Sequence, residues 1–168
     1  MVAPLGKIKA PKMTTGRYIA LMAGIALYAS FGGYSAGMQP AGMGWRFFSY
    51  HPLLMTAGFV GMMGSAAITK KRGGYTNTKL HGIIGWLGLM MAYGGFYVIY
   101  SNKESNNKPH FVSSHSIGGL FALVGTTMIG MAGGVLLHPD FGVAKTNKTF
   151  RLLHKWAGRI ILLVAWFT

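Results

Sequence analysis

The chain has 168 residues, of which 51% are apolar and only 11% charged, whereas about 25% are charged in an average soluble domain. Its 16 Lys and Arg residues stand against two acidic ones, Glu104 and Asp140, for a formal net charge of +14. Such a charge suits nucleic-acid binding, but here the basic residues lie between long apolar runs. The pattern excludes nucleic acid as partner and predicts an integral membrane protein in contact with a lipid bilayer. Without cysteine, disulfides and thiolate-ligated iron–sulfur clusters are also excluded.

The first two apolar runs are each long enough to cross a bilayer, which takes about 20 residues. We predict a first helix over about 17–37, which the Gln, Pro and Gly residues at 39–42 break. A second helix starts near 47 or 50 and reaches 69, where the sequence Lys-Lys-Arg-Gly-Gly at 70–74 ends it.

Two further runs have the same length. The third predicted helix covers about 79–100 and leads into a polar loop at 101–109. The fourth starts near 111 or 114 and reaches 137, where a Pro-Asp pair at 139–140 closes it. Both lack charged residues in their central parts, as membrane-spanning helices should.

A fifth apolar helix begins near Phe150 and is still apolar at Thr168, but only nine residues follow Arg159. That is short of a comfortable crossing, so we expect the C-terminus to be incomplete. The sequence as a whole predicts an all-α membrane protein with one transmembrane helical domain over 1–168, five visible helices, and a basic N-terminal tail over 1–16.

The Lys and Arg residues between helices predict the orientation. One side carries Lys7, Lys9, Lys12, Arg17, Lys70, Lys71, Arg72, Lys79, Lys145, Lys148, Arg151 and Lys155, and the other only Arg46, Lys103 and Lys108. The positive-inside rule places the richer side, and the N-terminus with it, in the cytosol, matrix or stroma. The sequence does not specify which membrane this is.

Four histidines each lie near the start of their own predicted helix: His51, His81, His115 and His154. Ionisable groups in membrane segments are costly and usually functional. Successive helices run in opposite directions, so His51 and His115 should share the outer side, and His81 and His154 the inner side. Neighbouring histidines cannot pair across about 30 Å of hydrocarbon. The sequence thus predicts two sites, each with two imidazoles.

A pair of imidazoles on facing helices suits a bis-histidine haem, which also needs room against the backbone. Glycine supplies that room four residues after three of the histidines, at Gly85, Gly119 and Gly158, and seven residues after a histidine at Gly58 and Gly88. Close helix packing by small residues explains any one of these glycines equally well. Copper or zinc is a rival ligand, although it would want three or four donors together.

Basic residues near the predicted sites have two readings. Lys79 lies two residues before His81, and Arg151 three before His154, so both could stabilise haem propionates or attract an anionic reductant. Arg46 and His110 could do the same outside. In the other reading, the cations only anchor the chain by the positive-inside rule, and His110 is a satisfied interfacial residue.

Four short motifs around these histidines resemble the cytochrome b561 family. They are Tyr50-His51-Pro52-Leu53-Leu54-Met55, Lys79-Leu80-His81-Gly82, Ser113-Ser114-His115-Ser116 and Leu153-His154-Lys155, and the resemblance covers about residues 45–158. The sequence Pro109-His110-Phe111 is most similar to that of the shorter, domain-only members. Two features depart from the pattern of the family. The basic residue Lys79 lies one position closer to His81 than the corresponding residue does in many members, and the second predicted helix ends in Ile68-Thr69-Lys70.

The resemblance implies a six-helix bundle in which helices 2–5 hold two b-type haems, the outer on His51 and His115 and the inner on His81 and His154. It implies a haem-dependent transmembrane oxidoreductase that passes electrons from ascorbate, or a similar inner donor, to monodehydroascorbate or a ferric chelate outside. It also implies donor binding at Lys79 with Arg72 and Arg151 nearby, and an outer substrate near His110.

Two other functions remain open from the sequence. An accessory or structural subunit of a larger membrane electron-transport complex would fit the short loops, and a quinone-linked haem anchor would need a hydrophilic partner. Whether the chain is a monomer, a homodimer or part of such a complex is likewise open, as are the physiological donor and acceptor.

Overall fold

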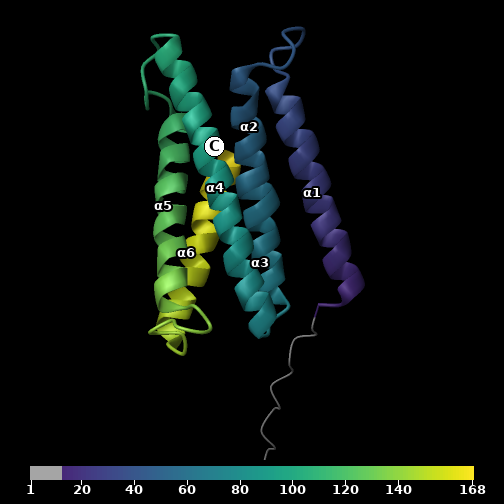
Figure 1. Cartoon of the computed structure of the whole chain (residues 1–168), viewed down its shortest axis with the longest axis vertical. Coiled ribbons are helices and arrows are strands. Elements are labelled where there is room, and N and C mark those ends of the chain that lie inside the picture. The colour runs from purple at the N-terminus through teal and green to yellow at the C-terminus, as the bar shows by residue number, and fades with distance from the viewer. Residues whose placement is uncertain (1–12) are drawn as a thin grey trace, which may run out of the picture.

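A computed structural model describes residues 13–168, and in this range the chain is a bundle of antiparallel helices without strands (Figure 1). The helices are α1 (Thr15–Gly37), α4 (Tyr75–Ser105), α5 (Ser114–Leu136) and α6 (Lys148–Phe167). Between α1 and α4 one continuous crossing runs through a short 3₁₀ turn η1 (Phe47–Ser49), α2 (Tyr50–Met55), a π-helical segment η2 (Thr56–Met63) and α3 (Gly64–Lys71). The predicted all-helical membrane bundle is confirmed.

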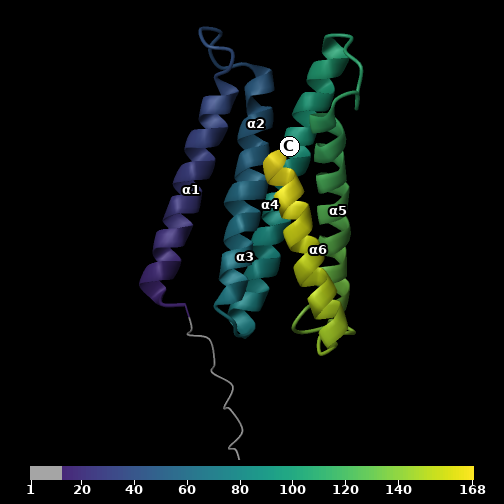
Figure 2. The same cartoon turned by 180° about the vertical axis from the view of Figure 1, so that it is seen from behind.

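Four helical crossings of the described chain are long and apolar enough to span a membrane: Thr15–Gly37, Phe47–Lys71, Tyr75–Ser105 and Ser114–Leu136. Helix α6 is amphipathic by comparison, with basic residues in its first half, and its C-terminal end lies part way along the bundle (Figures 1 and 2). Most of the predicted basic tail, residues 1–12, lies outside the described residues.

The loops end where specific caps begin the next helix. Ser113 and Ser116 form a capping box at α5, and the Asn147 side chain accepts hydrogen bonds from Thr149 and Phe150 at α6. Gly73 and Gly74 both have positive φ, at 74° and 85°, which glycine adopts without strain. That turn lets α4 begin at Tyr75, four residues before the predicted start.

Helix α4 also extends beyond its predicted end. The Ser105 hydroxyl donates to the Ser101 carbonyl at 2.9 Å, and the Asn106 amide donates to the Asn102 carbonyl at 2.6 Å. These polar residues stabilise the helix outside the membrane, so polarity marks the end of the span but not of the helix. The loop to α5 is correspondingly shorter than predicted.

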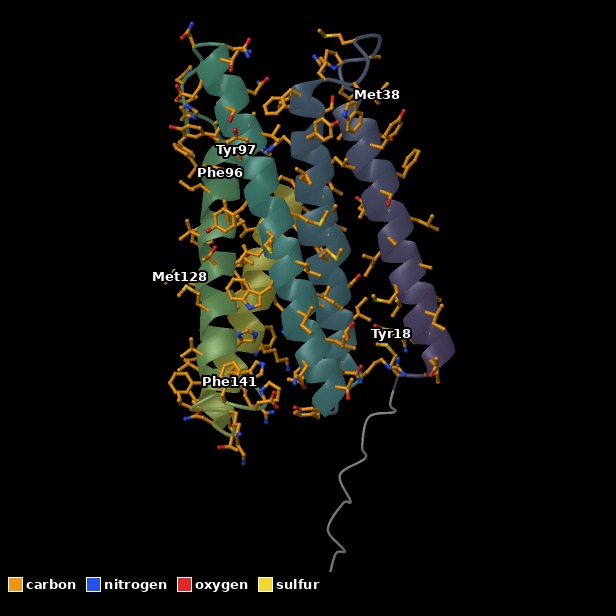
Figure 3. All side chains as sticks on the ribbon, in the orientation of Figure 1. Tyr18, Met38, Phe96, Tyr97, Met128 and Phe141 are labelled. Carbon is orange, nitrogen blue, oxygen red and sulfur yellow. The ribbon has the colours of Figure 1, made fainter. Side chains whose placement is uncertain are left out.

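Helix α4 contacts the second crossing along most of its length. The main buried core lies midway along the bundle and consists of six apolar residues from three crossings: Phe59, Met63, Leu89, Ala92, Ala122 and Leu123. Many other large apolar side chains point outward, among them Met128, which is 67% exposed (Figure 3). An apolar exterior around a small core is what a bilayer stabilises, because lipid is as apolar as the side chains themselves.

Candidate functional site

The four predicted histidines come together in two pairs. The imidazole centroids of His51 and His115 are 6.3 Å apart with ring planes at 87°, and those of His81 and His154 are 6.2 Å apart at 82°. His51 and His115 lie in the first turns of α2 and α5, at one end of the bundle, whereas His81 and His154 lie near the starts of α4 and α6 at the other (Figure 1). These are the pairs expected from the alternating directions of the helices.

The separation of the two imidazoles in each pair leaves room for one metal ion between them. Metal–imidazole bonds of about 2.0 Å, plus about 1.2 Å from each nitrogen to its ring centre, would put two centroids roughly 6.4 Å apart. Both observed separations match this value closely. Within residues 13–168 no three His, Cys or acidic side chains gather where they could hold a metal ion. The pairs therefore suit an ion whose other ligands belong to a macrocycle.

Backbone carbonyls orient the imidazoles. The His51 Nδ1–H donates to the Gly95 carbonyl at 2.9 Å, and the His81 Nδ1–H donates to the Ala66 carbonyl at 3.0 Å. His115 likewise uses Nδ1 to contact the Thr168 carbonyl. A carbonyl can only accept, so each ring carries its proton on Nδ1, and the Nε2 lone pair is left to bind a metal.

His154 differs from the other three. Its Nδ1 is buried and has no hydrogen-bond partner within the described residues. The ring packs against α5, because a Cβ atom built on Gly133 would lie 2.8 Å from the His154 Cε1. Only a glycine at this position leaves space for the imidazole. A buried nitrogen without a partner is unusual and is consistent with a site whose ligand completes the environment of the ring.

The glycines predicted to face a cofactor divide into two groups. A Cβ built on Gly85, Gly119 or Gly158 meets no atom within 4 Å, so these positions border open space. A Cβ on Gly58 would lie 2.7 Å from the Gly88 carbonyl oxygen, and one on Gly88 would lie 2.9 Å from that of Gly58. The first group can cradle a flat ligand beside its histidine. Gly58 and Gly88 instead permit η2 and α4 to pack closely. Close helix packing by small residues was the alternative explanation for these glycines in the sequence.

The end of the bundle that contains His81 and His154, called the inner end after the predicted orientation, carries the basic residues predicted to bind a donor. The Lys79 ammonium is 2.9 Å from Asp140 in the α5–α6 loop, and both side chains are about two-fifths exposed, at 40% and 39%. Tyr75 also donates a hydrogen bond to Asp140. The hydrogen bonds from Tyr75 and then Lys79 hold the pKa of Asp140 below its ordinary value. Lys79 is therefore already paired with a carboxylate of its own chain.

The other inner cations lie on two sides of the bundle. The Arg72 guanidinium lies over the Tyr18 ring at 4.5 Å and contacts Thr15, so it faces α1 (Figure 3 labels Tyr18). Lys70, which was not predicted as a site residue, is near enough to His81 and His154 to interact electrostatically with both. Arg151 is close to Lys70 in turn. The sequence Lys-Lys-Arg at 70–72 signalled a basic turn but not which of the three faces the histidines.

At the end of the bundle that contains His51 and His115, called the outer end after the predicted orientation, His110 lies within the α4–α5 loop and is held on both sides. Its Nε2 is 2.7 Å from the Glu104 carboxylate, and its ring stacks on Tyr100 with centroids 4.3 Å apart. The Phe111 ring stacks in turn on Phe96 at 6.4 Å. His110 is thus fixed by α4, beside the end of the bundle that contains His51 and His115.

An apolar helical bundle with a histidine pair near each end has the architecture of a transmembrane redox carrier. The chain belongs to the family described as eukaryotic cytochrome b561, whose profile matches residues 50–168. No curated protein matches the chain. The family binds b-type haem and transfers electrons across membranes, so the chain is an integral membrane protein of the haem-dependent oxidoreductase type.

Proposed function

We propose that this protein moves electrons across a membrane through two b-type haems, the outer held by His51 and His115 and the inner by His81 and His154. The observation that carries the proposal is the matched spacing of the two imidazole pairs at opposite ends of the bundle. A b-type haem supplies the redox chemistry, since its iron takes up and releases one electron, and the protein supplies ligands, burial and position.

The residues around each pair have defined tasks. Gly95 and Ala66 use their carbonyls to keep the Nε2 of His51 and His81 free for the iron. Gly85, Gly119 and Gly158 leave room for the macrocycle beside their histidines. The apolar core between the pairs excludes water from the middle of the membrane. These tasks are to orient the ligands, to leave room for the cofactor and to exclude water, and none requires a nucleophile or a general base.

We place the donor at the inner end, where Lys70 is close enough to His81 and His154 to interact with them, Arg151 is close to Lys70, and Lys79 lies in the first turns of α4. An anion such as ascorbate would be attracted to these cations. Arg72 faces α1 and contributes to the field more than to direct contact. Because Lys79 is paired with Asp140, an anionic donor that uses Lys79 has to compete with that carboxylate.

We place the acceptor, monodehydroascorbate or a ferric chelate, at the outer end near His110. The excess of Lys and Arg at the inner end supports an orientation with the N-terminus on the cytosolic, matrix or stromal side. In this orientation electrons leave a cytoplasm-like compartment, which holds soluble reductants, and reach an acceptor on the opposite side.

The first test is a reduced-minus-oxidised spectrum of the purified chain together with its haem-to-protein ratio, using ascorbate and then dithionite. Two b-type haems per chain, at least one reduced by ascorbate, would support both the carrier and its donor. Two haems reduced only by dithionite would remove ascorbate and favour a quinone-linked or in-complex role. A chain purified without haem would overturn the proposal and favour a structural subunit.

A further inference from the structure

Helices α5 and α6 leave an apolar groove of about 510 Å³ between them, which we call the α5–α6 groove. Its lining includes Met128, Ala132, Leu153, Trp156, Ala157 and Ile160. His154 and Trp156 are its only lining residues with a nitrogen or oxygen atom in the side chain. Met128, Leu153 and Ile160 are 67%, 59% and 57% exposed, and Figure 3 shows Met128 pointing away from the bundle. The groove therefore opens toward the membrane, where it suits a hydrocarbon chain.

Trp156 connects the α5–α6 groove to two basic residues of α6. The Lys155 ammonium lies 5.8 Å from the centre of its ring, and the Arg159 guanidinium lies 5.0 Å from it. Because Arg159 follows Trp156 by three residues, its side chain turns back along α6 toward the inner end. Long basic side chains snorkel in this way to bring their charge to the headgroups of a bilayer. The ring of Trp156 thus borders both an apolar groove and a pair of cations.

No acidic side chain of the chain is free to neutralise this pair of cations. The sequence has only two acidic residues: Asp140 is paired with Lys79, and Glu104 lies at the opposite end of the bundle. Within residues 13–168 neither Lys155 nor Arg159 forms an ion pair. Charged side chains that face lipid are costly unless an anion or water meets them. An anion beside Trp156 would lower that cost.

The position of Trp156 along α6 matches the headgroup region of a bilayer. Helix α6 begins at Lys148, and Trp156 is eight residues later, which is about 12 Å along the helix axis. Indole rings concentrate at the boundary between headgroups and acyl chains. From this level the groove continues along α6 to Ile160 and along α5 to Met128, toward the middle of the bundle. A lipid with its phosphate beside Trp156 would therefore have a path for an acyl chain.

We propose that α6 binds one anionic glycerophospholipid, with its phosphate between Lys155 and Arg159 and one acyl chain in the α5–α6 groove. The two cations favour an anionic headgroup, Trp156 covers the glycerol region, and the groove holds the chain. An anchor that follows only the positive-inside rule depends on the total charge of the inner end, whereas this site depends on these two residues. The inference does not rest on the proposed electron transfer.

Native mass spectrometry of the purified full chain counts bound lipids, with dioleoylphosphatidylglycerol as the probe. Dioleoylphosphatidylcholine has the same chains and no net charge, so it is the comparison for the headgroup. One phosphatidylglycerol should bind per chain, about tenfold more tightly than phosphatidylcholine, because two basic residues meet its phosphate. Dihexanoylphosphatidylglycerol has the same headgroup, and it should bind more weakly because its short chains leave most of the groove empty.

Two variants test the cations. Lys155→Gln and Arg159→Gln should each weaken phosphatidylglycerol binding about fivefold, as expected for one basic residue at a membrane surface, and leave phosphatidylcholine binding unchanged. Both side chains are exposed, so neither variant disturbs the core. Lys71→Gln is the matched control, because it removes the same charge at the inner end from the exposed end of α3. It should leave the affinity within about twofold of the parent.

Equal binding of the two dioleoyl lipids, or equal weakening by all three variants, would overturn the proposal and leave only a positive-inside anchor. Displacement of the lipid by inorganic phosphate or ascorbate would overturn it too, and would assign the cations to a soluble anion. Loss of haem from Lys155→Gln or Arg159→Gln with unchanged lipid binding would assign them to haem propionates instead. Specific phosphatidylglycerol binding by a chain without haem would keep this inference and reject the proposed function.

Discussion

The Nδ1–H of His51, on α2, donates to the carbonyl of Gly95, on α4, at 2.9 Å. At the other end of the same two crossings the direction is reversed, and His81 of α4 donates to the Ala66 carbonyl of α3 at 3.0 Å. Each crossing thus supplies one imidazole and orients the imidazole of the other. The orientation depends on backbone carbonyls, so side-chain substitution cannot remove it directly, only through a shift of the helices.

Removing one histidine should remove one haem and leave the other. His51→Ala and His115→Ala should give the same loss, and His81→Ala and His154→Ala the complementary loss, because a bis-histidine site needs both imidazoles. The haem-to-protein ratio from pyridine haemochrome spectra measures this. Four different spectra, or the loss of both haems from any single variant, would contradict the pairing.

Substitution by a residue with a larger side chain should affect the two groups of glycines differently, in stability for one group and in haem content for the other. Gly58→Ala and Gly88→Ala place a methyl group 2.7 and 2.9 Å from a facing carbonyl oxygen and should destabilise the fold by about 1–3 kcal/mol. Gly85→Leu and Gly158→Leu point into open space and should leave the haem-free fold unchanged while lowering haem content. Unfolding in detergent and haem content, measured on the same samples, separate the two effects. Equal haem content in Gly85→Leu and the parent would argue against a macrocycle at that glycine.

The link between Asp140 and α4 should be insensitive to pH over the neutral range. The hydrogen bonds from Tyr75 and Lys79 lower the pKa of Asp140 in the folded state, and the unfolded value is about 3.9. Such a group stabilises the fold fully above the unfolded pKa and loses that effect as pH falls through the folded pKa. Hydrogen exchange of residues 138–147 should therefore be steady, after correction for the intrinsic rate, from pH 5 to 8.

Asp140→Asn should speed exchange in that loop at pH 7 and lower the KM for ascorbate, since it releases Lys79 from its internal carboxylate. The matched control is Glu104→Gln, which removes the other acid of the chain at the opposite end of the bundle. If ascorbate kinetics are the same in Asp140→Asn and the parent, Lys79 does not contact the donor.

His110 should affect the outer reaction alone. His110→Ala removes a ring that Tyr100 and Glu104 hold in place, and should raise the KM for an outer acceptor about tenfold, as the loss of a charge-assisted hydrogen bond does. Reduction of the protein by its inner donor should be unchanged. Rapid-mixing spectroscopy with donor and acceptor added separately resolves the two steps, and a slower donor step would show that His110 acts through the fold.

The orientation can be tested directly because the chain has no cysteine. Ala41→Cys, in the exposed α1–α2 loop, should react with a membrane-impermeant maleimide from the outside of intact vesicles or cells. Thr146→Cys, in the α5–α6 loop, should react only after permeabilisation. The opposite pattern would reverse the proposed direction of electron flow.

The sequence predicted those parts of the site that follow from direction and spacing along single helices. Alternating helices were enough to pair His51 with His115 and His81 with His154. A spacing of four selected Gly85, Gly119 and Gly158, which border open space, and their contact with a haem stays a prediction. A spacing of seven selected Gly58 and Gly88, which face each other across η2 and α4 instead, because the spacing does not show which glycines meet a neighbouring helix.

Contacts between distant segments were out of reach of the sequence. The sequence around Lys79 does not predict its ion pair with Asp140, because the two residues lie on different elements. That Lys70 interacts with the inner pair while Arg72 faces α1 depends on how the end of α3 is rotated about its axis. A cavity lined by Arg46, Phe48 and Asn102 likewise forms only when the α1–α2 loop folds over the end of α4.

The buried core between the two histidine pairs, built from Phe59, Met63, Leu89, Ala92, Ala122 and Leu123, contains no titratable side chain. A proton therefore has no relay through this core, and an electron that passes the core crosses it as uncompensated charge. A full crossing of the bilayer is worth about 2.3 kcal/mol for every 100 mV of membrane potential. The protein would then respond to voltage, and a membrane that is negative inside would drive electrons outward through it.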